Sequence, residues 1–114
     1  MRLLLFDIDA TLLSTSGAGI RAMEDAGREL FTPAFSAAGL DFAGRLDPLI
    51  IADLFRRHGI EADAAGLGRF VNAYRERLRE RLEAERRSRV LPGVAELLEA
   101  LGRRADVVLG VLTG

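Results

Sequence analysis

The stretch Leu3-Leu4-Leu5-Phe6-Asp7-Ile8-Asp9-Ala10-Thr11-Leu12 begins as an apolar run and ends with two carboxylates two residues apart. A short apolar run is typical of a strand that is buried on both faces. Side chains at i and i+2 of an extended segment point the same way, so Asp7 and Asp9 are expected to converge just past the strand unless a turn intervenes. In open α/β sheets, ligands bind at that edge. Two converging carboxylates repel each other unless a cation or a shared proton relieves them.

Helical periodicity fills most of the chain between this run and a second strand-like run near residue 110. We expect strands at residues 2–6 and 107–112, and helices at residues 18–31, 47–59, 63–88 and 94–103. Asp47 and Pro48 are typical of a helix N-cap and of the first helical residue. Acidic and basic residues alternate along residues 63–88, so the charged face of this helix is expected to be ion-paired and exposed to solvent.

The composition is that of a globular protein, with 49% hydrophobic and 29% charged residues in 114. This length is typical of one domain. The formal net charge of −1 gives no electrostatic case for nucleic acid or a membrane as a partner. The apolar run at the N-terminus is too short for a signal peptide or a membrane span. The chain has no cysteine, which suits a cytosolic protein, so we expect a cytoplasmic location.

The segment from Phe6 to Leu12 resembles the first motif of the haloacid dehalogenase-like (HAD) hydrolases, Asp-x-Asp-Gly-Thr-Leu. The resemblance implies that Asp7 is a nucleophile that forms an aspartyl-phosphate, and that Asp9 is first general acid and then general base. Thr11 would help to hold the motif or the phosphate. Mg²⁺ would be bound by Asp7 and by Asp9, the latter through its backbone carbonyl. Ala10 stands where the family has Gly, which costs strain if the position needs a positive φ and is tolerated if it needs only a small residue.

Two later segments also resemble this family. Gly44-Arg45-Leu46-Asp47-Pro48 is similar to a cap-domain segment of phosphatases related to phosphoglycolate phosphatase and β-phosphoglucomutase. The resemblance implies that Arg45 reaches the substrate as a fork for phosphate or carboxylate, and a solvated loop arginine is an equal alternative. The second strand-like run leads into Thr113-Gly114, which resembles the family's second motif. There Thr113 would hydrogen-bond the transferring phosphoryl group, and we assign Gly114 to substrate binding with it.

The sequence therefore predicts an α/β fold. We expect a partial Rossmann-like core of residues 1–13 and 89–114, with an all-helical cap of residues 14–88 inserted between them. Members of the family continue to a motif that carries Lys, sometimes Arg, and then to an acidic pair. Neither follows here, and the chain contains no lysine at all. We therefore expect the 114 residues to be the N-terminal portion of such an enzyme, inactive by itself.

The predicted function is Mg²⁺-dependent hydrolysis of a small phosphorylated metabolite through an aspartyl-phosphate. A phosphomutase would use the same residues. A non-catalytic helical interaction protein with a relict motif is an alternative that explains the missing groups directly. A nucleotide-binding module at Gly17 and Gly19 is a third, because residues 17–22 fit G-x-G-x-x-A. That motif normally follows its strand directly, whereas here ten residues separate Phe6 from Gly17, which disfavours it.

Overall fold

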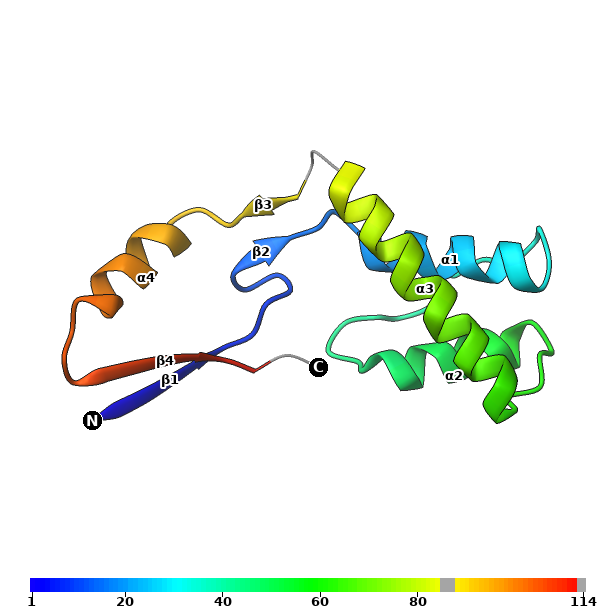
Figure 1. Ribbon diagram of the computed structural model, residues 1–114, viewed down its shortest axis with the longest axis horizontal. Helices are drawn as coiled ribbons and strands as arrows, with labels where there is room; N and C mark the ends of the chain where they lie inside the picture. Colours follow the sequence, from blue (N-terminus) through cyan, green and yellow to red (C-terminus); the bar gives the residue numbers. More distant parts are fainter. Residues whose placement is uncertain (85–87, 113–114) are drawn as a thin grey trace. The chain divides into compact units, whose positions relative to one another are not determined.

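The computed structural model of the chain describes residues 1–84 and 88–112 (Figure 1). They form two compact units, one of residues 1–16 and 88–112 and the other of residues 17–84. The elements in chain order are β1 (Arg2–Phe6), β2 (Leu13–Ser14), α1 (Ala18–Leu30), α2 (Asp47–Arg57), α3 (Ala64–Ala84), β3 (Arg89–Val90), α4 (Val94–Gly102) and β4 (Val107–Val111). The protein is thus mixed α/β, as predicted. The strands and α4 belong to the first unit, and α1, α2 and α3 form the second.

In the first unit, β1 and β4 pair in parallel, with Arg2 opposite Val107 and Phe6 opposite Val111. The Leu112 N–H donates to the Phe6 carbonyl at 2.9 Å and continues this ladder past the end of β4. Both strands were predicted from their apolar runs. Because they are parallel, their carboxyl ends lie at the same edge of the sheet, where the chain leaves β1 toward Asp7.

The expectation that this sheet is buried on both faces is wrong for the described residues. Leu3 and Leu5 are 62% and 53% exposed, and Val108, which pairs with Leu3, is 47% exposed. These three side chains share one face, because the side-chain period of a strand is two. Helix α4 packs against β4. An apolar run indicates that a strand is suited to a buried position, but burial also requires a layer that covers the strand. In this unit, α4 is the helix that packs against the strands.

Two short strands were not predicted. In β2 and β3, Leu13 pairs with Val90 and Ser14 with Arg89 in antiparallel register. Two residues carry no periodicity, so a pattern in the sequence cannot reveal such a strand. Their pairing connects the end of the loop after β1 to the segment that precedes α4, within the same unit.

The helical unit is built around aromatic side chains. Phe35, Phe55 and Phe70 are fully buried, and the Phe55 and Phe70 rings meet edge to face with centroids 5.2 Å apart. Edge-to-face contact is a favoured geometry for aromatic pairs. Phe31 packs edge to face on Phe55 at 5.3 Å. The predicted helices at 18–31, 47–59, 63–88 and 94–103 are confirmed as elements, although residues 85–87 of the third lie outside the described part of the chain.

The prediction that Asp47 is an N-cap is wrong by one position. Leu46 is the N-cap, with an extended backbone at φ −79° and ψ 145°, and Asp47 is the first helical residue of α2. The Asp47 carboxylate accepts a hydrogen bond from the Tyr74 hydroxyl of α3, at 3.0 Å. The Asp47 side chain, which the sequence pattern assigned to the N-cap, is therefore bonded to a residue of another helix instead.

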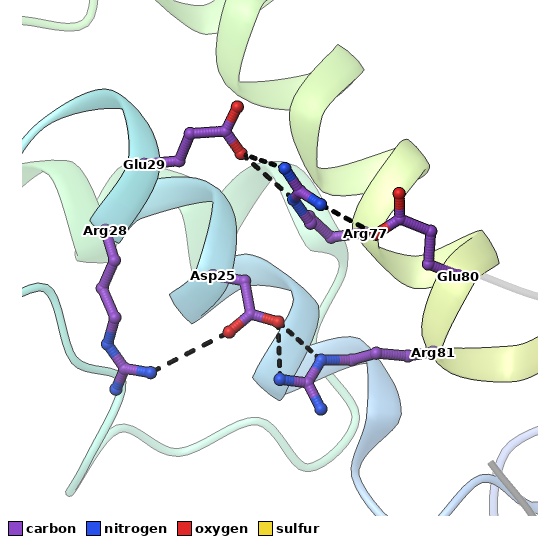
Figure 2. A pocket seen from close by; sticks show the side chains of 6 residues that line it. All are labelled: Asp25, Arg28, Glu29, Arg77, Glu80 and Arg81. Carbon is purple, nitrogen blue, oxygen red and sulfur yellow. Dashed lines mark hydrogen bonds and ion pairs between the residues drawn. The ribbon is translucent and has the colours of Figure 1, made fainter. Parts of the chain in front are cut away.

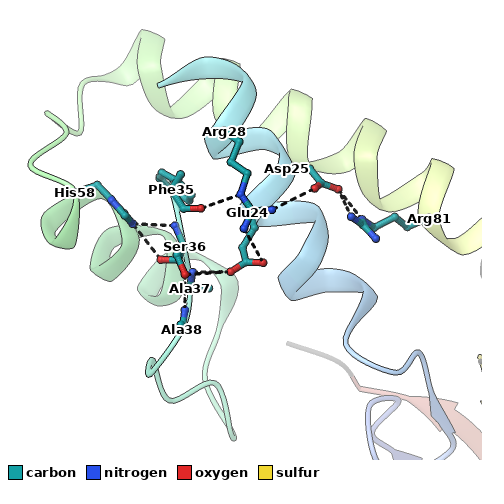
Figure 3. Close-up of polar contacts among 9 residues, drawn as sticks. All are labelled: Glu24, Asp25, Arg28, Phe35, Ser36, Ala37, Ala38, His58 and Arg81. Atoms are coloured by element: carbon teal, nitrogen blue, oxygen red, sulfur yellow. Dashed lines mark hydrogen bonds and ion pairs between the residues drawn. The ribbon is translucent and has the colours of Figure 1, made fainter. Parts of the chain in front are cut away.

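The irregular segment between α1 and α2 is held by polar contacts from the middle of α1 and from the C-terminal end of α2 (Figure 3). Glu24 Oε1 accepts the Ala37 N–H at 2.9 Å. His58 Nε2 lies 3.2 Å from the Ser36 nitrogen and 3.0 Å from the Ser36 carbonyl oxygen, and its ring stacks on Phe35 at 4.4 Å. These contacts hold Phe35 in the core although it lies in no regular element.

Arginines of α3 pair with acids of α1 (Figure 2). Arg77 contacts Glu29 and Glu80, each at 2.8 Å, and these hydrogen bonds, chiefly that with Glu29, raise the pKa of Arg77 above its usual range. Arg81 lies 2.5 Å from Asp25. The prediction that the charged face is ion-paired is confirmed, and part of the pairing extends to a second helix.

Candidate functional site

The carboxylates singled out by the sequence lie in a tight loop between β1 and β2. The Ile8 carbonyl accepts the N–H groups of Thr11, Leu12 and Leu13 at 3.3, 2.9 and 3.2 Å. The Ala10 N–H donates to the Leu13 carbonyl at 3.0 Å. The chain thus turns immediately after the strand, so the geometry expected for an extended segment ends before Asp9. The turn satisfies much of its own backbone hydrogen bonding.

Ala10 adopts a left-handed conformation at φ 58°. Glycine visits this region without penalty, whereas a residue with a Cβ pays about 1–2 kcal/mol. The alternative left open by the sequence is thereby decided, because this position needs a positive φ rather than only a small side chain. Strained residues of this kind gather at functional sites, where the surrounding structure holds them.

The side chains of the loop are accessible. Asp7, Asp9 and Thr11 are all exposed. Asp7 Oδ1 accepts the N–H of Ile8 at 2.8 Å, which fixes one oxygen of that carboxylate. The loop therefore presents two carboxylates and one hydroxyl within five consecutive residues of a single unit.

Both ends of the loop are tied to neighbouring strands. On the entering side, β1 pairs with β4 up to Phe6 and Val111. On the leaving side, the Leu12 carbonyl accepts the Leu91 N–H at 3.0 Å, next to the β2–β3 pairing. No role was predicted from the sequence for the backbones of Leu12 and Leu91. Thr113 and Gly114, assigned to substrate binding from the sequence, lie outside the described residues.

Arg45 belongs to the helical unit and is engaged there. Its guanidinium lies 2.6 Å from Asp53 Oδ2 and donates to the Asp41 carbonyl at 3.1 Å. Asp53 also pairs with Arg56. The Arg45 side chain thus braces the loop before α2 and is 28% exposed, and both roles considered for it, substrate fork and loop arginine, stay predictions.

Asp7 and Asp9 are also the candidate ligands for Mg²⁺. No three His, Cys, Asp or Glu side chains within residues 1–84 and 88–112 are grouped so as to hold a metal ion. Mg²⁺ keeps several waters and is often bound by one or two carboxylates together with substrate phosphate. The exposed oxygen donors of the loop are of the right chemistry for such a site.

Comparison of the chain with protein-family models gives no match, and comparison with curated proteins gives none. Within the part of the chain that the structure describes, no helix is both long enough and apolar enough to cross a membrane. The functional assignment therefore rests on the residues themselves and on the geometry of the loop after β1.

Proposed function

We propose that this protein transfers the phosphoryl group of a small phosphate monoester to Asp7, as in the HAD hydrolases that its opening motif resembles. One observation carries the proposal. The loop after β1 exposes Asp7 and Asp9 at the carboxyl end of a parallel strand pair, and it passes through a positive φ at Ala10, where the motif has Gly. A partial Rossmann-like core of residues 1–13 and 89–114 with a helical cap of residues 14–88 is part of this proposal.

The Asp7 carboxylate is the nucleophile. Its Oδ1 is held by the Ile8 N–H, so we assign the attack on phosphorus to Oδ2. As the new oxygen–phosphorus bond forms, the bond to the leaving alkoxide breaks, and Asp9 gives that alkoxide a proton. Asp9 then takes a proton from the water that attacks the aspartyl-phosphate, which releases inorganic phosphate and restores Asp7. Mg²⁺, when bound by Asp7 and Asp9, offsets the negative charge of the carboxylates and the phosphoryl group.

The remaining assigned residues bind the phosphate. Thr11 lies in the same loop as the carboxylates, and Thr113, Gly114 and Arg45 are assigned by resemblance. Phosphoryl transfer depends on charge neutralisation as much as on the nucleophile. The chain has no lysine for this purpose, so slow turnover or none is expected of the 114 residues, and covalent capture at Asp7 is the more direct test.

The test uses beryllofluoride, which forms a stable analogue of an acyl phosphate on a nucleophilic carboxylate. Fluorine NMR of the chain with Mg²⁺ and beryllofluoride is expected to show a bound signal that is absent in Asp7→Asn. Asp106→Asn is the matched control, because Asp106 precedes β4 at the opposite end of the sheet and pairs with Arg104. A bound signal of equal size in Asp7→Asn, or none in the unaltered chain, would contradict the proposal.

Turnover gives a second measurement. Any Mg²⁺-dependent hydrolysis of an aryl phosphate should fall to background in Asp7→Asn, because no other group forms the covalent intermediate. Asp9→Asn should retain capture of beryllofluoride and lose turnover, since it removes the proton donor and leaves the nucleophile. Equal rates in the unaltered chain and both variants would favour the non-catalytic helical interaction protein instead.

A further inference from the structure

The helical unit contains a pocket that the proposed phosphoryl transfer does not use. It lies between the start of α2 and the middle of α3 and has a volume of about 390 Å³. Small-molecule sites are typically about 300–1,000 Å³ and mostly apolar with a few polar groups, and this pocket has that character. Pro48, Ile51 and Val71 are among its apolar lining residues, and Asp47, Tyr74 and Arg75 are its polar ones.

The pocket carries one charge of each sign, and no opposite charge within the described residues pairs with either. The Asp47 carboxylate accepts a hydrogen bond from the Tyr74 hydroxyl at 3.0 Å, and that partner is neutral. Arg75 is exposed, and its side chain forms no hydrogen bond or ion pair with the rest of residues 1–84 and 88–112. The lining therefore has no net charge, but it offers a carboxylate and a guanidinium beside one apolar surface.

A ligand with a single charge meets one favourable and one unfavourable group in such a pocket. An anion is attracted by Arg75 and repelled by Asp47, and for a cation the two effects are reversed. A small molecule that carries both charges can pair with both residues at once. The apolar walls add a further requirement, because they favour a ligand with an apolar body.

We infer that this pocket binds a zwitterion of the apolar α-amino acid class. The ammonium group of the ligand pairs with Asp47, its carboxylate pairs with Arg75, and its side chain rests against the apolar walls. Guanidinium presents a planar fork of donors that matches a carboxylate. A carboxylate has more acceptor sites than the one that the Tyr74 hydroxyl occupies, so Asp47 can accept from an ammonium group as well. The inference requires no chemistry at Asp7, so its failure would leave the proposed phosphoryl transfer untouched.

The chain provides its own reporter for this site. Tyr74 is the only tyrosine and there is no tryptophan, so intrinsic fluorescence comes from a residue that lines the pocket. The probes are leucine, isocaproate and isoamylammonium, which share one apolar body and carry both charges, the negative charge alone and the positive charge alone. None of them absorbs where tyrosine is excited. We expect a saturable change with leucine at a Kd on the order of millimolar, and binding of each singly charged probe that is weaker by about two- to fivefold, the range of one exposed ion pair.

Three variants test which residue pairs with which charge. Arg75→Gln should weaken the binding of leucine and isocaproate by about two- to fivefold and should not weaken that of isoamylammonium. Asp47→Asn should weaken the binding of leucine and isoamylammonium by about the same factor and should not weaken that of isocaproate. Arg79→Gln is the matched control, since Arg79 is an exposed arginine of the same helix that does not line this pocket, and all three affinities should be unchanged. Circular dichroism confirms that each variant folds.

The pattern across the three probes separates the pairing of charges from a general loss of the pocket. A fluorescence change that rises linearly without saturation would overturn the inference, as would equal affinity for leucine and either singly charged probe. Equal weakening of all three probes by Arg75→Gln and by Asp47→Asn would also overturn it, because the two residues would then act only on the shape of the pocket.

Discussion

Ala10 bears the backbone cost of the turn that places Asp7 and Asp9. At φ 58° its Cβ is unfavourable, so Ala10→Gly should stabilise the strand unit by about 0.5–1 kcal/mol, even after the extra freedom that glycine gives to the unfolded chain. Hydrogen exchange of the amides that pair β1 with β4 measures this, because it reports on this unit alone.

Ala95 is the matched control for that substitution. It is exposed, lies in the first turn of α4 of the same unit and has no positive φ, so Ala95→Gly should cost stability, by about 0.5 kcal/mol. Opposite signs at the two alanines would attribute the gain to the left-handed backbone. Slower amide exchange in both variants, or unchanged amide exchange in Ala10→Gly, would show that the turn is not strained there.

Gly27 is the glycine of the helical unit at which an added Cβ would make the closest contact. A Cβ built on Gly27 of α1 would overlap the ring of Phe35, which is fully buried. Gly27→Ala should therefore destabilise the helical unit by about 1–3 kcal/mol, because overpacking forces a buried ring to move. Thermal unfolding followed by circular dichroism measures the change.

Gly68 supplies the comparison for Gly27. It also lies in a helix, α3, and a Cβ at this position would meet nothing within 4 Å. Gly68→Ala should raise stability by about 0.5–1 kcal/mol through helix propensity alone. If Gly27→Ala were as stabilising as Gly68→Ala, the close packing between Gly27 and Phe35 would be wrong.

Only part of the candidate site could be predicted from the sequence. The spacing of Asp7 and Asp9 after an apolar run marked them as candidates, because chemistry of that kind depends on local order in the sequence. The conformation of Ala10 and the pairing of Arg45 with Asp53 could not be predicted. The first is set by hydrogen bonds across a turn, and the second depends on how α2 places Asp53, eight residues further along the chain.

At the scale of elements, the ion pairs made by arginines of α3 differ in burial. Arg81 and Asp25 are 34% and 27% exposed, whereas Arg79 and Glu76 within α3 are 67% and 62% exposed. Screening by water weakens exposed pairs most. A double-mutant cycle with Arg81→Gln and Asp25→Asn should give a coupling energy of about 0.5–1 kcal/mol, and the Arg79–Glu76 cycle should give a coupling near zero.

Urea unfolding at low and high salt checks this difference. The coupling between Arg81 and Asp25 should shrink at 1 M salt, where the screening length is about 3 Å. The cycle isolates the pair only if the single variants make no new contacts, and Asp25 also lies 3.9 Å from Arg28. Equal coupling energies in the two cycles would mean that the bridge between helices adds nothing to the packing of α1 on α3.

Elements were predictable where they are long enough to carry a period. Helices α1, α2, α3 and α4 all follow apolar residues at helical spacing, and β1 and β4 follow apolar runs. The strands β2 and β3 have two residues each and depend on one another for hydrogen bonds, so neither has a signal of its own. The ion pairs between α3 and α1 could not be predicted either, because alternating charges are expected both on a solvent-exposed helix face and on one that contacts a charged neighbouring helix.

At the scale of the whole molecule, the two units differ in what holds them together. Every fully buried hydrophobic side chain among the described residues belongs to the helical unit, including Phe35, Phe55 and Phe70. In residues 1–16 and 88–112, no residue is buried, and Leu3 and Leu5 stay largely exposed. Apolar burial is the main favourable term in folding, so the helical unit should be the more stable of the two.

This difference predicts that the units unfold separately. Amides of α1 and α3 should exchange far more slowly than those of β1 and β4, because a two-stranded sheet with one exposed face gains little from burial. A fragment of residues 17–84 should keep its helical circular dichroism and its cooperative unfolding, with a midpoint close to that of the whole chain. Phe70→Ala should lower the free energy of opening at the helix amides by about 3–5 kcal/mol. The same free energy at the amides of β1 and β4 should stay nearly unchanged. One common exchange rate for all amides, or loss of the β1–β4 protection in Phe70→Ala, would mean instead that the chain folds as a single cooperative body whose strands depend on the helical core.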